Sequence, residues 1–284
     1  MDTRATAVLK AGNNAVITGG ASGIGLAAAQ RFAAHGLNVA LADLSQEKLD
    51  EAVRLINEQT PDVNAQGYCC DVSDFSQVRD FANSVSDEFG DVSILMSNAG
   101  TLLPTGKSWE NIDQWRKLVD INLWGVIHGV QAFVPSMLES GKEGIVVNTG
   151  SKQGITKPPS AFAYNLSKAG VIAFTEGLAH DLRSVEQSKI SAHLLVPGFT
   201  YTGMISQFLP EKPAEAWTSD EVVDFLLERL DRGDFYIICP DNDVSEEMDA
   251  KRIQWYADDL IQGRPALSRW HPDFADAFKA HMES

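Results

Sequence analysis

Short apolar runs alternate with longer segments of helical periodicity along most of the 284-residue chain. The apolar runs do not alternate strictly with polar residues, which is typical of strands covered on both faces. Seven such strands are predicted, at residues 14–18, 38–42, 67–70, 92–96, 145–149, 190–196 and 235–239. Helices are predicted between them, near residues 23–35, 46–58, 74–88, 111–139, 161–186 and 219–231.

This alternation predicts an α/β fold, because parallel strands need a crossover connection and a helix usually supplies it. Right-handed crossovers place the helices on both faces of the sheet. The chain shows neither an internal repeat nor a low-complexity linker. We therefore expect a single domain over residues 1–240, a Rossmann-type doubly wound parallel sheet of about seven strands with helices on both faces.

Residues 241–284 follow the last predicted strand and have a different pattern. Helical periodicity near residues 245–262 and 272–282 flanks a turn-prone Gly-Arg-Pro segment. The aromatic residues Trp255, Trp270 and Phe274 indicate docking rather than disorder. We expect a C-terminal helical extension packed on the same domain.

Composition narrows the class of protein. The hydrophobic content is an ordinary 44%, and no segment has the roughly 20 consecutive apolar residues of a membrane span. The first residues contain no apolar run long enough for a secretory signal. Cys69, Cys70 and Cys239 cannot all pair and are interpreted as reduced thiols. We expect a cytoplasmic protein that does not bind membranes.

The formal net charge of −16 argues against a nucleic-acid partner, because phosphates need a basic face. The six histidines are scattered without the spacing of metal ligands, so no metal site is predicted.

The first predicted strand runs into Thr18-Gly-Gly-Ala-Ser-Gly-Ile-Gly25 and then into a helix. Glycines at 19, 23 and 25 permit a tight turn, and the amides of a helix N-terminus can bind a pyrophosphate. A plain strand–turn–helix connection would explain the glycines as well.

Asp43 ends the second predicted strand, where a carboxylate can accept both ribose hydroxyls of an adenosine and repel a 2′-phosphate. The glycine turn contributes no basic residue, so NAD is favoured over NADP. Asp71 and Val72 follow the third strand, where they could meet the adenine edge, but Asp71 or Ser73 could equally cap the next helix. Ser97-Asn-Ala-Gly100 follows the fourth strand, on the side where such sheets bind ligands.

Tyr164 and Lys168 lie four residues apart at the start of a predicted helix, in the stretch SAFAYNLSK. Residues at this spacing share one helix face. A free tyrosine has a pKa of about 10, and a nearby ammonium should lower it by favouring the phenolate. Ser151 comes just after the fifth strand, at the same edge of the sheet, and Asn122 lies inside a predicted helix where an amide is unusual.

These motifs resemble the classical short-chain dehydrogenases/reductases over roughly residues 10–240. The matching pieces are Thr18-Gly-x-x-x-Gly-x-Gly25, Asn98-Ala-Gly100, Asn122, Ser151, Tyr164-x-x-Ser-Lys168 and Pro197-Gly198. By that resemblance Tyr164 is the catalytic acid/base and Ser151 orients the substrate oxygen. Lys168 binds the ribose and lowers the pKa of the tyrosine, and Asn122 holds a water in a proton relay. Gly198 begins a segment whose backbone near Thr200, with the Thr202 hydroxyl, would meet the nicotinamide carboxamide.

The resemblance also implies an NAD site and a homo-oligomer, a dimer or a tetramer. The expected cofactor-binding residues are Gly19, Ser22, Gly23, Ile24, Gly25, Asp43, Leu44, Asp71, Val72, Asn98, Ala99, Gly100, Tyr164, Lys168, Pro197, Gly198, Thr200 and Thr202. Two positions depart from the family pattern, Ser97 in place of an asparagine and Gly150 in place of a serine. The long C-terminal segment puts the usual tetramer in doubt.

The resulting expectation is an NAD-dependent oxidoreductase that interconverts a secondary alcohol and a ketone or aldehyde. An NADP-linked carbonyl reductase and a non-enzymatic dinucleotide-binding sensor are the alternatives, opposed by Asp43 and by Tyr164 respectively. Apolar residues in three segments predict a hydrophobic or aromatic small-molecule substrate. They are Leu102, Leu103, Ile155, Phe162, Phe199, Met204, Ile205, Phe208, Leu209 and Trp217. Lys152 and Lys157 leave an acidic group on the substrate possible.

Overall fold

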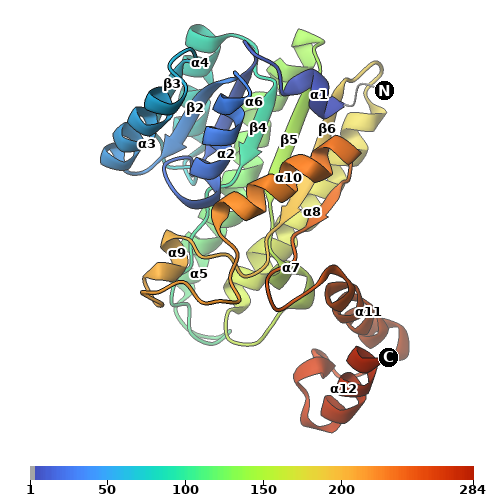
Figure 1. Cartoon of the computed structure of the whole chain (residues 1–284). Coiled ribbons are helices and arrows are strands. Elements are labelled where there is room, and N and C mark those ends of the chain that lie inside the picture. Colours follow the sequence, from blue (N-terminus) through green and yellow to red (C-terminus); the bar gives the residue numbers. More distant parts are fainter. Residues whose placement is uncertain (1–3) are drawn as a thin grey trace.

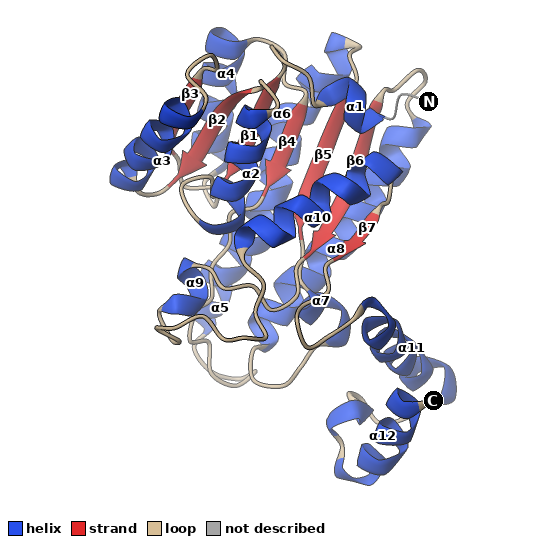
Figure 2. Cartoon of the chain, viewed as in Figure 1, coloured by secondary structure: helices blue, strands red, loops and turns tan. Residues whose placement is uncertain are grey.

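The computed structural model describes residues 4–284, and its core is one parallel seven-stranded sheet. The strand order is β3-β2-β1-β4-β5-β6-β7, which confirms the expected doubly wound arrangement. The strands are β1 Asn14–Thr18, β2 Asn38–Asp43, β3 Ala65–Cys69, β4 Ile94–Ser97, β5 Gly144–Thr149, β6 Ile190–Val196 and β7 Tyr236–Ile238. All of them point toward one end of the sheet, where α5, α7 and α9 lie (Figure 2).

Twelve α-helices surround and extend the sheet in the described part of the chain (Figure 1). They are α1 Arg4–Val8, α2 Gly23–Ala34, α3 Gln46–Gln59, α4 Phe75–Phe89, α5 Ile112–Val119, α6 Gly125–Ser140, α7 Lys152–Thr156, α8 Phe162–Ser184, α9 Gly203–Ser206, α10 Ser219–Arg232, α11 Glu246–Gln262 and α12 Ala275–Glu283. The short helices α1, α7 and α9 were not predicted, because four or five residues carry too little periodicity.

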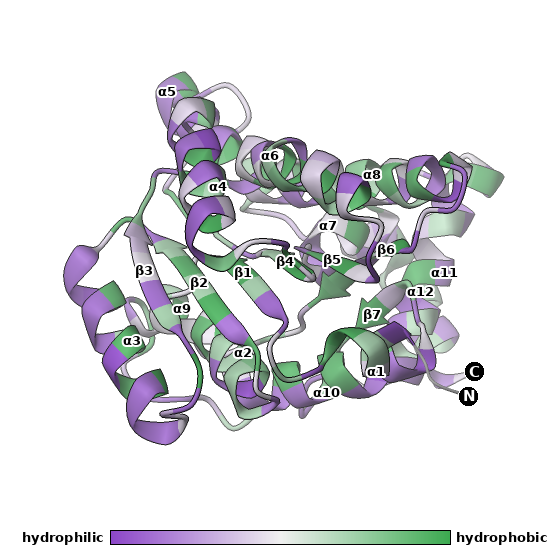
Figure 3. Ribbon diagram, turned by 90° about the horizontal axis from the view of Figure 1, so that it is seen from above, coloured by the Kyte–Doolittle hydropathy of each residue, from purple (hydrophilic) through white to green (hydrophobic). Residues whose placement is uncertain are grey.

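The helices form two layers, one on each face of the sheet, as the view along its edge shows (Figure 3). Helices α1, α2, α3 and α10 share one buried cluster with the strand side chains Ala15 and Ile17. Helices α4, α6 and α8 share the other, which contains Val16. Because successive strand residues point to opposite faces, both sets are apolar, and this explains the unbroken apolar runs.

The predicted and observed strand boundaries differ most at β3 and β4. The third strand covers Ala65–Cys69 rather than residues 67–70, and the fourth covers Ile94–Ser97 rather than residues 92–96. Strand β3 is at the edge of the sheet and most of its residues are only half-buried, so its hydrophobic signal is weak.

The helix predicted near residues 111–139 is interrupted. Helices α5 and α6 are joined by a π-helical turn, Asp120–Trp124, in which the Gly125 amide donates to the Asp120 carbonyl. Such turns are rare and often mark functional sites. Asn122 lies at the centre of this one, fully buried.

Helices α11 and α12 and the two 3-10 turns between them, Ser268–Trp270 and Pro272–Phe274, form the C-terminal extension. It lies beyond α7, at the carboxyl end of the strands (Figure 1). The Trp255 ring contacts Phe278 and His281 of α12, and the Arg264 guanidinium lies over it at 4.0 Å from the ring centroid. This tryptophan is therefore at the centre of a small core within the extension, while α11 contacts the rest of the chain at α7.

Among residues 4–284, no helix has the length and apolar character required to cross a membrane. The same residues contain no group of three or more His, Cys, Asp or Glu side chains that could hold a metal ion. Cys70 and Cys239 are buried and Cys69 is exposed, and all three are free thiols.

Candidate active site

The glycine turn between β1 and α2 is built so that two backbone segments touch. A Cβ added to Gly25 would lie 2.1 Å from the carbonyl oxygen of Gly19, and one added to Gly19 would lie 2.8 Å from the Cα of Ala99. Gly19 also has a φ of +65°, which favours glycine. The glycines therefore bring the N-terminus of α2 against the carboxyl ends of β1 and β4. Ser22, the N-cap of α2, and Ile24 in its first turn lie in this turn.

Asn98 holds this turn in place. Its Nδ2 donates to the carbonyl oxygens of Thr18 and Gly19 at 3.3 and 3.4 Å, and its Oδ1 accepts from the Thr149 hydroxyl. The amides of Asn98 and Ala99 both donate to the Thr18 hydroxyl. Asn98 thus links the carboxyl ends of β1, β4 and β5, and the hydrogen bonds of its side chain stabilise the glycine turn.

Asp43 lies at the end of β2 and faces the same turn. Its Oδ2 accepts a hydrogen bond of 3.3 Å from the Ala21 amide, and its Oδ1 accepts one of 2.8 Å from the Leu44 amide. The carboxylate keeps acceptor capacity beyond these two bonds, since each ionised oxygen can accept more than one. Leu44 follows with 62% of its surface exposed.

Asp71 and Val72 follow β3 but are largely engaged by the protein. The Asp71 carboxylate accepts hydrogen bonds from both the amide and the hydroxyl of Ser73. The N-cap of α4 is Asp74, not Asp71 or Ser73. The Val72 side chain is buried against the position of Gly125, where an added Cβ would lie 2.7 Å from it. These contacts shape the loop after β3, and they correct the idea that Asp71 or Ser73 caps the helix.

Asn122 and Lys168 meet beside Gly100. A Cβ added to Gly100 would lie 3.5 Å from Oδ1 of Asn122 and 3.7 Å from Nζ of Lys168. The Asn122 amide group pairs with the backbone of Thr101, accepting at 2.7 Å and donating at 2.9 Å, and Nδ2 also lies 3.4 Å from the Ser167 hydroxyl. Residues from three separate segments are thereby brought to one point of the crevice.

Tyr164 and Ser151, predicted to be catalytic, meet in this crevice. Ser151 caps the N-terminus of α7, accepting a hydrogen bond of 3.2 Å from the Gln153 amide, and its hydroxyl interacts with the Tyr164 phenol. Lys168 is buried one helical turn further along α8, where its Nζ lies 5.8 Å from the centroid of the Tyr164 ring. The four predicted catalytic side chains, Asn122, Ser151, Tyr164 and Lys168, therefore lie at one edge of the sheet.

The pKa of Tyr164 differs from the sequence-based expectation. Burial raises the pKa of Tyr164 above its ordinary value, and the Ser151 hydroxyl opposes that rise. Burial also lowers the pKa of Lys168 to about 8. In the protein alone, desolvation is the larger effect, so the pKa of Tyr164 does not show the fall that was expected from the nearby Lys168.

The segment after β6 closes the crevice from the other side. Thr202 lies over the glycine turn, 3.4 Å from a Cβ added to Gly23, and Thr200 is buried with its hydroxyl donating to the Gly198 carbonyl. Thr200 also forms an isolated bridge with Trp217, which anchors the loop that α9 belongs to. The carbonyl oxygen of Pro197 accepts from the Lys152 amide at 3.3 Å.

The apolar residues expected at a substrate site divide into two sets. The Trp217 ring packs on Phe225 at 5.8 Å between centroids, and Ile155 packs against a buried cluster of α8 and β6, so both are supporting residues. Phe208 and Leu209 are exposed, on the loop after α9. Lys157 is engaged by Tyr256 and Lys152 by Asp249, so neither ammonium is free.

Two supporting residues were not assigned a role from the sequence. The Thr149 carbonyl accepts from Nζ of Lys168 at 2.8 Å, and the Ser167 hydroxyl joins Asn122 to the Tyr164 carbonyl. Ser167 had a signal, since it belongs to the Tyr164-x-x-Ser-Lys168 motif. The bond to Thr149 uses a backbone carbonyl, which every residue has, so the sequence could not indicate it.

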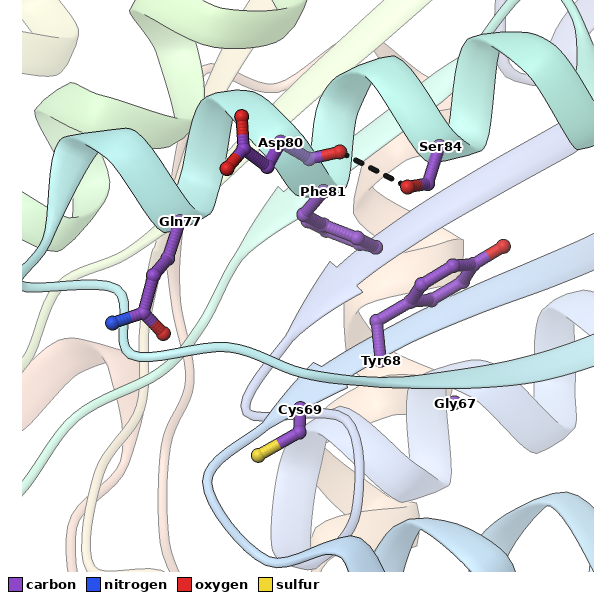
Figure 4. Close-up of a pocket in the computed structure, with 7 residues that line it drawn as sticks. All are labelled: Gly67, Tyr68, Cys69, Gln77, Asp80, Phe81 and Ser84. Atoms are coloured by element: carbon purple, nitrogen blue, oxygen red, sulfur yellow. Dashed lines mark hydrogen bonds between the residues drawn. The ribbon is translucent and has the colours of Figure 1, made fainter.

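A separate hollow of about 450 Å³ lies between β3 and α4, and none of the predicted site residues lines it (Figure 4). The Tyr68 and Phe81 rings face each other there, with 5.0 Å between centroids, and Ser84 donates to the Asp80 carbonyl. The hollow is open to solvent at the sheet edge and contains no residue of the catalytic set.

The crevice itself suits a dinucleotide. It combines an anion-binding helix N-terminus, a carboxylate at the end of the neighbouring strand and a proton-carrying phenol at the far side. These features lie on both sides of the point between β1 and β4 where the strand order reverses, which is where such sheets bind ligands.

The chain is similar to known proteins. The family model described as short chain dehydrogenase matches residues 13–213. A 3α-hydroxysteroid dehydrogenase of Mediterraneibacter gnavus is 35% identical over 197 residues, 69% of this chain and 77% of the relative. A 2-dehydro-3-deoxy-L-rhamnonate dehydrogenase (NAD(+)) of a Sphingomonas species is 37% identical over 206 residues, 72% of this chain and 78% of the relative.

Solved structures agree. A short chain dehydrogenase/reductase from Burkholderia phymatum, in complex with NAD, superimposes with a TM-score of 0.80 at 29% identity, covering 90% of this chain and 96% of that one. Other similar structures contain NADP. The chain therefore belongs to the classical short-chain dehydrogenase/reductase family, and it is an oxidoreductase that uses a nicotinamide dinucleotide.

Proposed function

We propose that the protein is an NAD-dependent oxidoreductase that interconverts a secondary alcohol and a ketone or aldehyde, with a hydrophobic or aromatic substrate. The observation that carries this proposal is the interaction of the Ser151 hydroxyl with the Tyr164 phenol, close to Lys168, which meets Asn122 beside Gly100. A protein that only binds a dinucleotide has no need of this pair.

The chain's own residues would move the proton. In the direction of reduction, Tyr164 donates its phenolic proton to the substrate oxygen, and its raised pKa keeps that proton in place at neutral pH. In the direction of oxidation, Tyr164 takes the proton of the alcohol, and Ser151 orients the substrate oxygen. A bound nicotinamide would supply or accept the hydride.

Positive charge near Tyr164 decides how readily it acts as a base. Lys168, with a pKa of about 8, is largely protonated at neutral pH. An oxidised nicotinamide adds a second positive charge, which favours the phenolate. Lys168 has donors beyond its bond to Thr149, and these would hold the nicotinamide ribose. Asn122, through the helix backbone at its π-helical turn, would hold a water that returns the proton.

The preference for NAD is proposed from Asp43. Its carboxylate faces the glycine turn, and the segment from Gly19 to Gly25 contains no Lys or Arg that could bind a 2′-phosphate. A ribose hydroxyl pair can donate to the carboxylate, whereas a 2′-phosphate would be repelled. One relative is named for NAD(+), in agreement with this choice.

The substrate class is proposed from two segments that the family resemblance places at the border of the substrate site. Leu102 and Leu103 follow the Asn98–Gly100 segment, and Phe208 and Leu209 are exposed on the loop after α9. This apolar border favours an alicyclic or aryl alcohol. The relative named for a 3α-hydroxysteroid is an example of a bulky alicyclic alcohol.

We also propose that the protein acts as a homodimer or homotetramer. The large apolar side chains of Trp109, Leu260 and Ile261 are more than 70% exposed, and burying them against a second copy would remove apolar surface from water. Sedimentation equilibrium tests this directly. A mass near the 30.9 kDa of one chain would contradict it.

The proposed activity is tested with a panel of secondary alcohols, aryl, alicyclic and steroid, together with sugars and hydroxyacyl thioesters, each supplied with NAD⁺ or NADP⁺. Absorbance of the reduced cofactor reports turnover. We expect turnover of at least one apolar alcohol with NAD⁺, and little with NADP⁺. Turnover of sugars or acyl thioesters alone, or an NADP⁺ preference, would contradict the proposed substrate class or cofactor.

A further inference from the structure

Lys152 connects the catalytic serine to the C-terminal extension. It is the first residue of α7, directly after Ser151, yet its side chain turns inward and is only 15% exposed. Its Nζ lies 2.6 Å from Oδ2 of Asp249 on α11 and 3.5 Å from Oδ2 of Asp241, which follows β7. Both carboxylates are less than 10% exposed, so water screens this contact poorly.

The same ion pair borders the segment expected to meet the nicotinamide. Oδ2 of Asp241 accepts a hydrogen bond of 3.2 Å from the Phe199 amide. A Cβ added to Gly198 would lie 2.8 Å from this oxygen and 3.0 Å from Nζ of Lys152. The Lys152 backbone amide donates to the Pro197 carbonyl. Lys152 therefore links α7 to the segment after β6 in two ways. Its backbone amide bonds to Pro197, and its side chain pairs with Asp241, which in turn bonds to the Phe199 amide.

We propose that Asp249, acting through Lys152, is a positioning residue for the nicotinamide half of the site. The extension would then hold the serine on α7 and the Pro197–Gly198 turn in the relative position that the cofactor needs. This inference rests on the proposed function, because it assumes that a dinucleotide occupies the crevice.

Charge explains why Asp249 is required. Asp241 and Asp249 are two buried carboxylates around one ammonium, and Arg252 lies further from Asp249, at 3.9 Å. Burial raises the pKa of Asp249, and Lys152 opposes that rise. Without Asp249, Lys152 keeps Asp241 as its single close partner at 3.5 Å, and a buried, half-paired ammonium gains by moving toward water. Its movement would release the Pro197–Gly198 turn.

A purely structural ion pair would behave differently from a positioning one. Loss of a structural pair lowers the melting temperature and weakens every ligand to a similar extent. Loss of a positioning pair weakens those ligands that contact the positioned segment. ADP-ribose lacks the nicotinamide, so it would use the glycine turn and Asp43 but not the Pro197–Gly198 segment, whereas NADH would use both.

The test is therefore the Kd of NADH and of ADP-ribose for the full-length Asp249→Asn variant, measured by calorimetry. We expect the Kd of NADH to rise about tenfold and that of ADP-ribose to change less than about twofold, because misplacing one contact segment affects the group it touches. Asp249→Glu, which keeps the carboxylate, should recover most of the NADH affinity. Glu247→Gln is the matched control, since Glu247 lies on the same helix with an exposed ion pair to Lys251.

Unchanged NADH affinity in Asp249→Asn, or equal weakening of both ligands, would overturn the inference. Should Asp249→Asn lose its cooperative melting transition, Lys152→Gln replaces it, and the same changes in the two Kd values support or overturn the inference. Failure of the proposed function looks different: the wild-type protein itself would not bind NADH. If it binds NADPH instead, the comparison runs with NADPH and 2′-phospho-ADP-ribose.

Discussion

The Nζ atom of Lys168 donates a hydrogen bond of 2.8 Å to the carbonyl oxygen of Thr149, the last residue of β5. This bond fixes the ammonium at the end of a central strand, 5.8 Å from the centroid of the Tyr164 ring. Lys168 is 3% exposed, and its desolvation is the main cause of its lowered pKa. The lysine is therefore held ready to bind a ligand, at a cost to the stability of the free protein.

That cost predicts a pH dependence of stability. The pKa of Lys168 is about 8 in the folded protein and 10.5 ordinarily, so between these values the unfolded chain binds a proton that the folded protein lacks. The free energy of unfolding should then rise with pH relative to Lys168→Met, by about 2 kcal/mol between pH 7 and pH 9.5. Urea unfolding of both proteins at the two pH values measures the difference. Lys279 is exposed, so the difference in the free energy of unfolding between the wild-type protein and Lys279→Met should not change with pH.

The glycine turn predicts a sharp contrast between two Gly→Ala variants. In Gly25→Ala the new methyl group would lie 2.1 Å from the Gly19 carbonyl oxygen and 2.8 Å from Nδ2 of Asn98, so the turn must open. We expect the free energy of unfolding to fall by about 2 kcal/mol. We also expect NADH binding to be lost. Gly177 lies on α8 with no atom within 4 Å of an added Cβ, so Gly177→Ala should stabilise the protein by about 0.5 kcal/mol. Equal stabilities of the two variants would refute this account of the turn.

Asp43 predicts the cofactor preference. Asp43→Asn keeps the size of the side chain and one acceptor for the Ala21 or Leu44 amide, but removes the charge. The ratio of the NADPH and NADH dissociation constants should fall about tenfold, because the repulsion of a 2′-phosphate is lost. Fluorescence titration with the two reduced cofactors measures this ratio. The exposed Asp62 offers a control, and an unchanged ratio in Asp43→Asn would remove Asp43 as the discriminating residue.

The features that could be predicted from the sequence are local ones. Strand β1 and strand β6 have the predicted boundaries, because their apolar runs are buried on both faces and end at turns. The glycine turn was predicted as well, since its backbone requires specific residues at specific positions. The parallel topology followed from the alternation of strands and helices.

Features that depend on contacts between segments far apart in the chain could not be predicted. The π-helical turn around Asn122 packs on α8, and the prediction of one continuous helix over residues 111–139 missed it. Lys152 meets Asp241, 89 residues away, and nothing in the sequence pairs them. The pKa of Tyr164 was expected to fall because the spacing to Lys168 suggested attraction alone. The structure adds the burial of the phenol, and this larger effect has the opposite sign.

The central claim, that the Tyr164 phenol carries the proton, is tested most directly by Tyr164→Phe. This variant keeps the ring and removes the hydroxyl that interacts with Ser151. With an alcohol that the wild-type protein oxidises, we expect kcat to fall about a thousandfold, since the proton has no acceptor. The Kd of NADH should stay within about twofold, which shows that the crevice is intact. A variant that binds NADH normally and retains a tenth or more of the wild-type kcat would contradict the account.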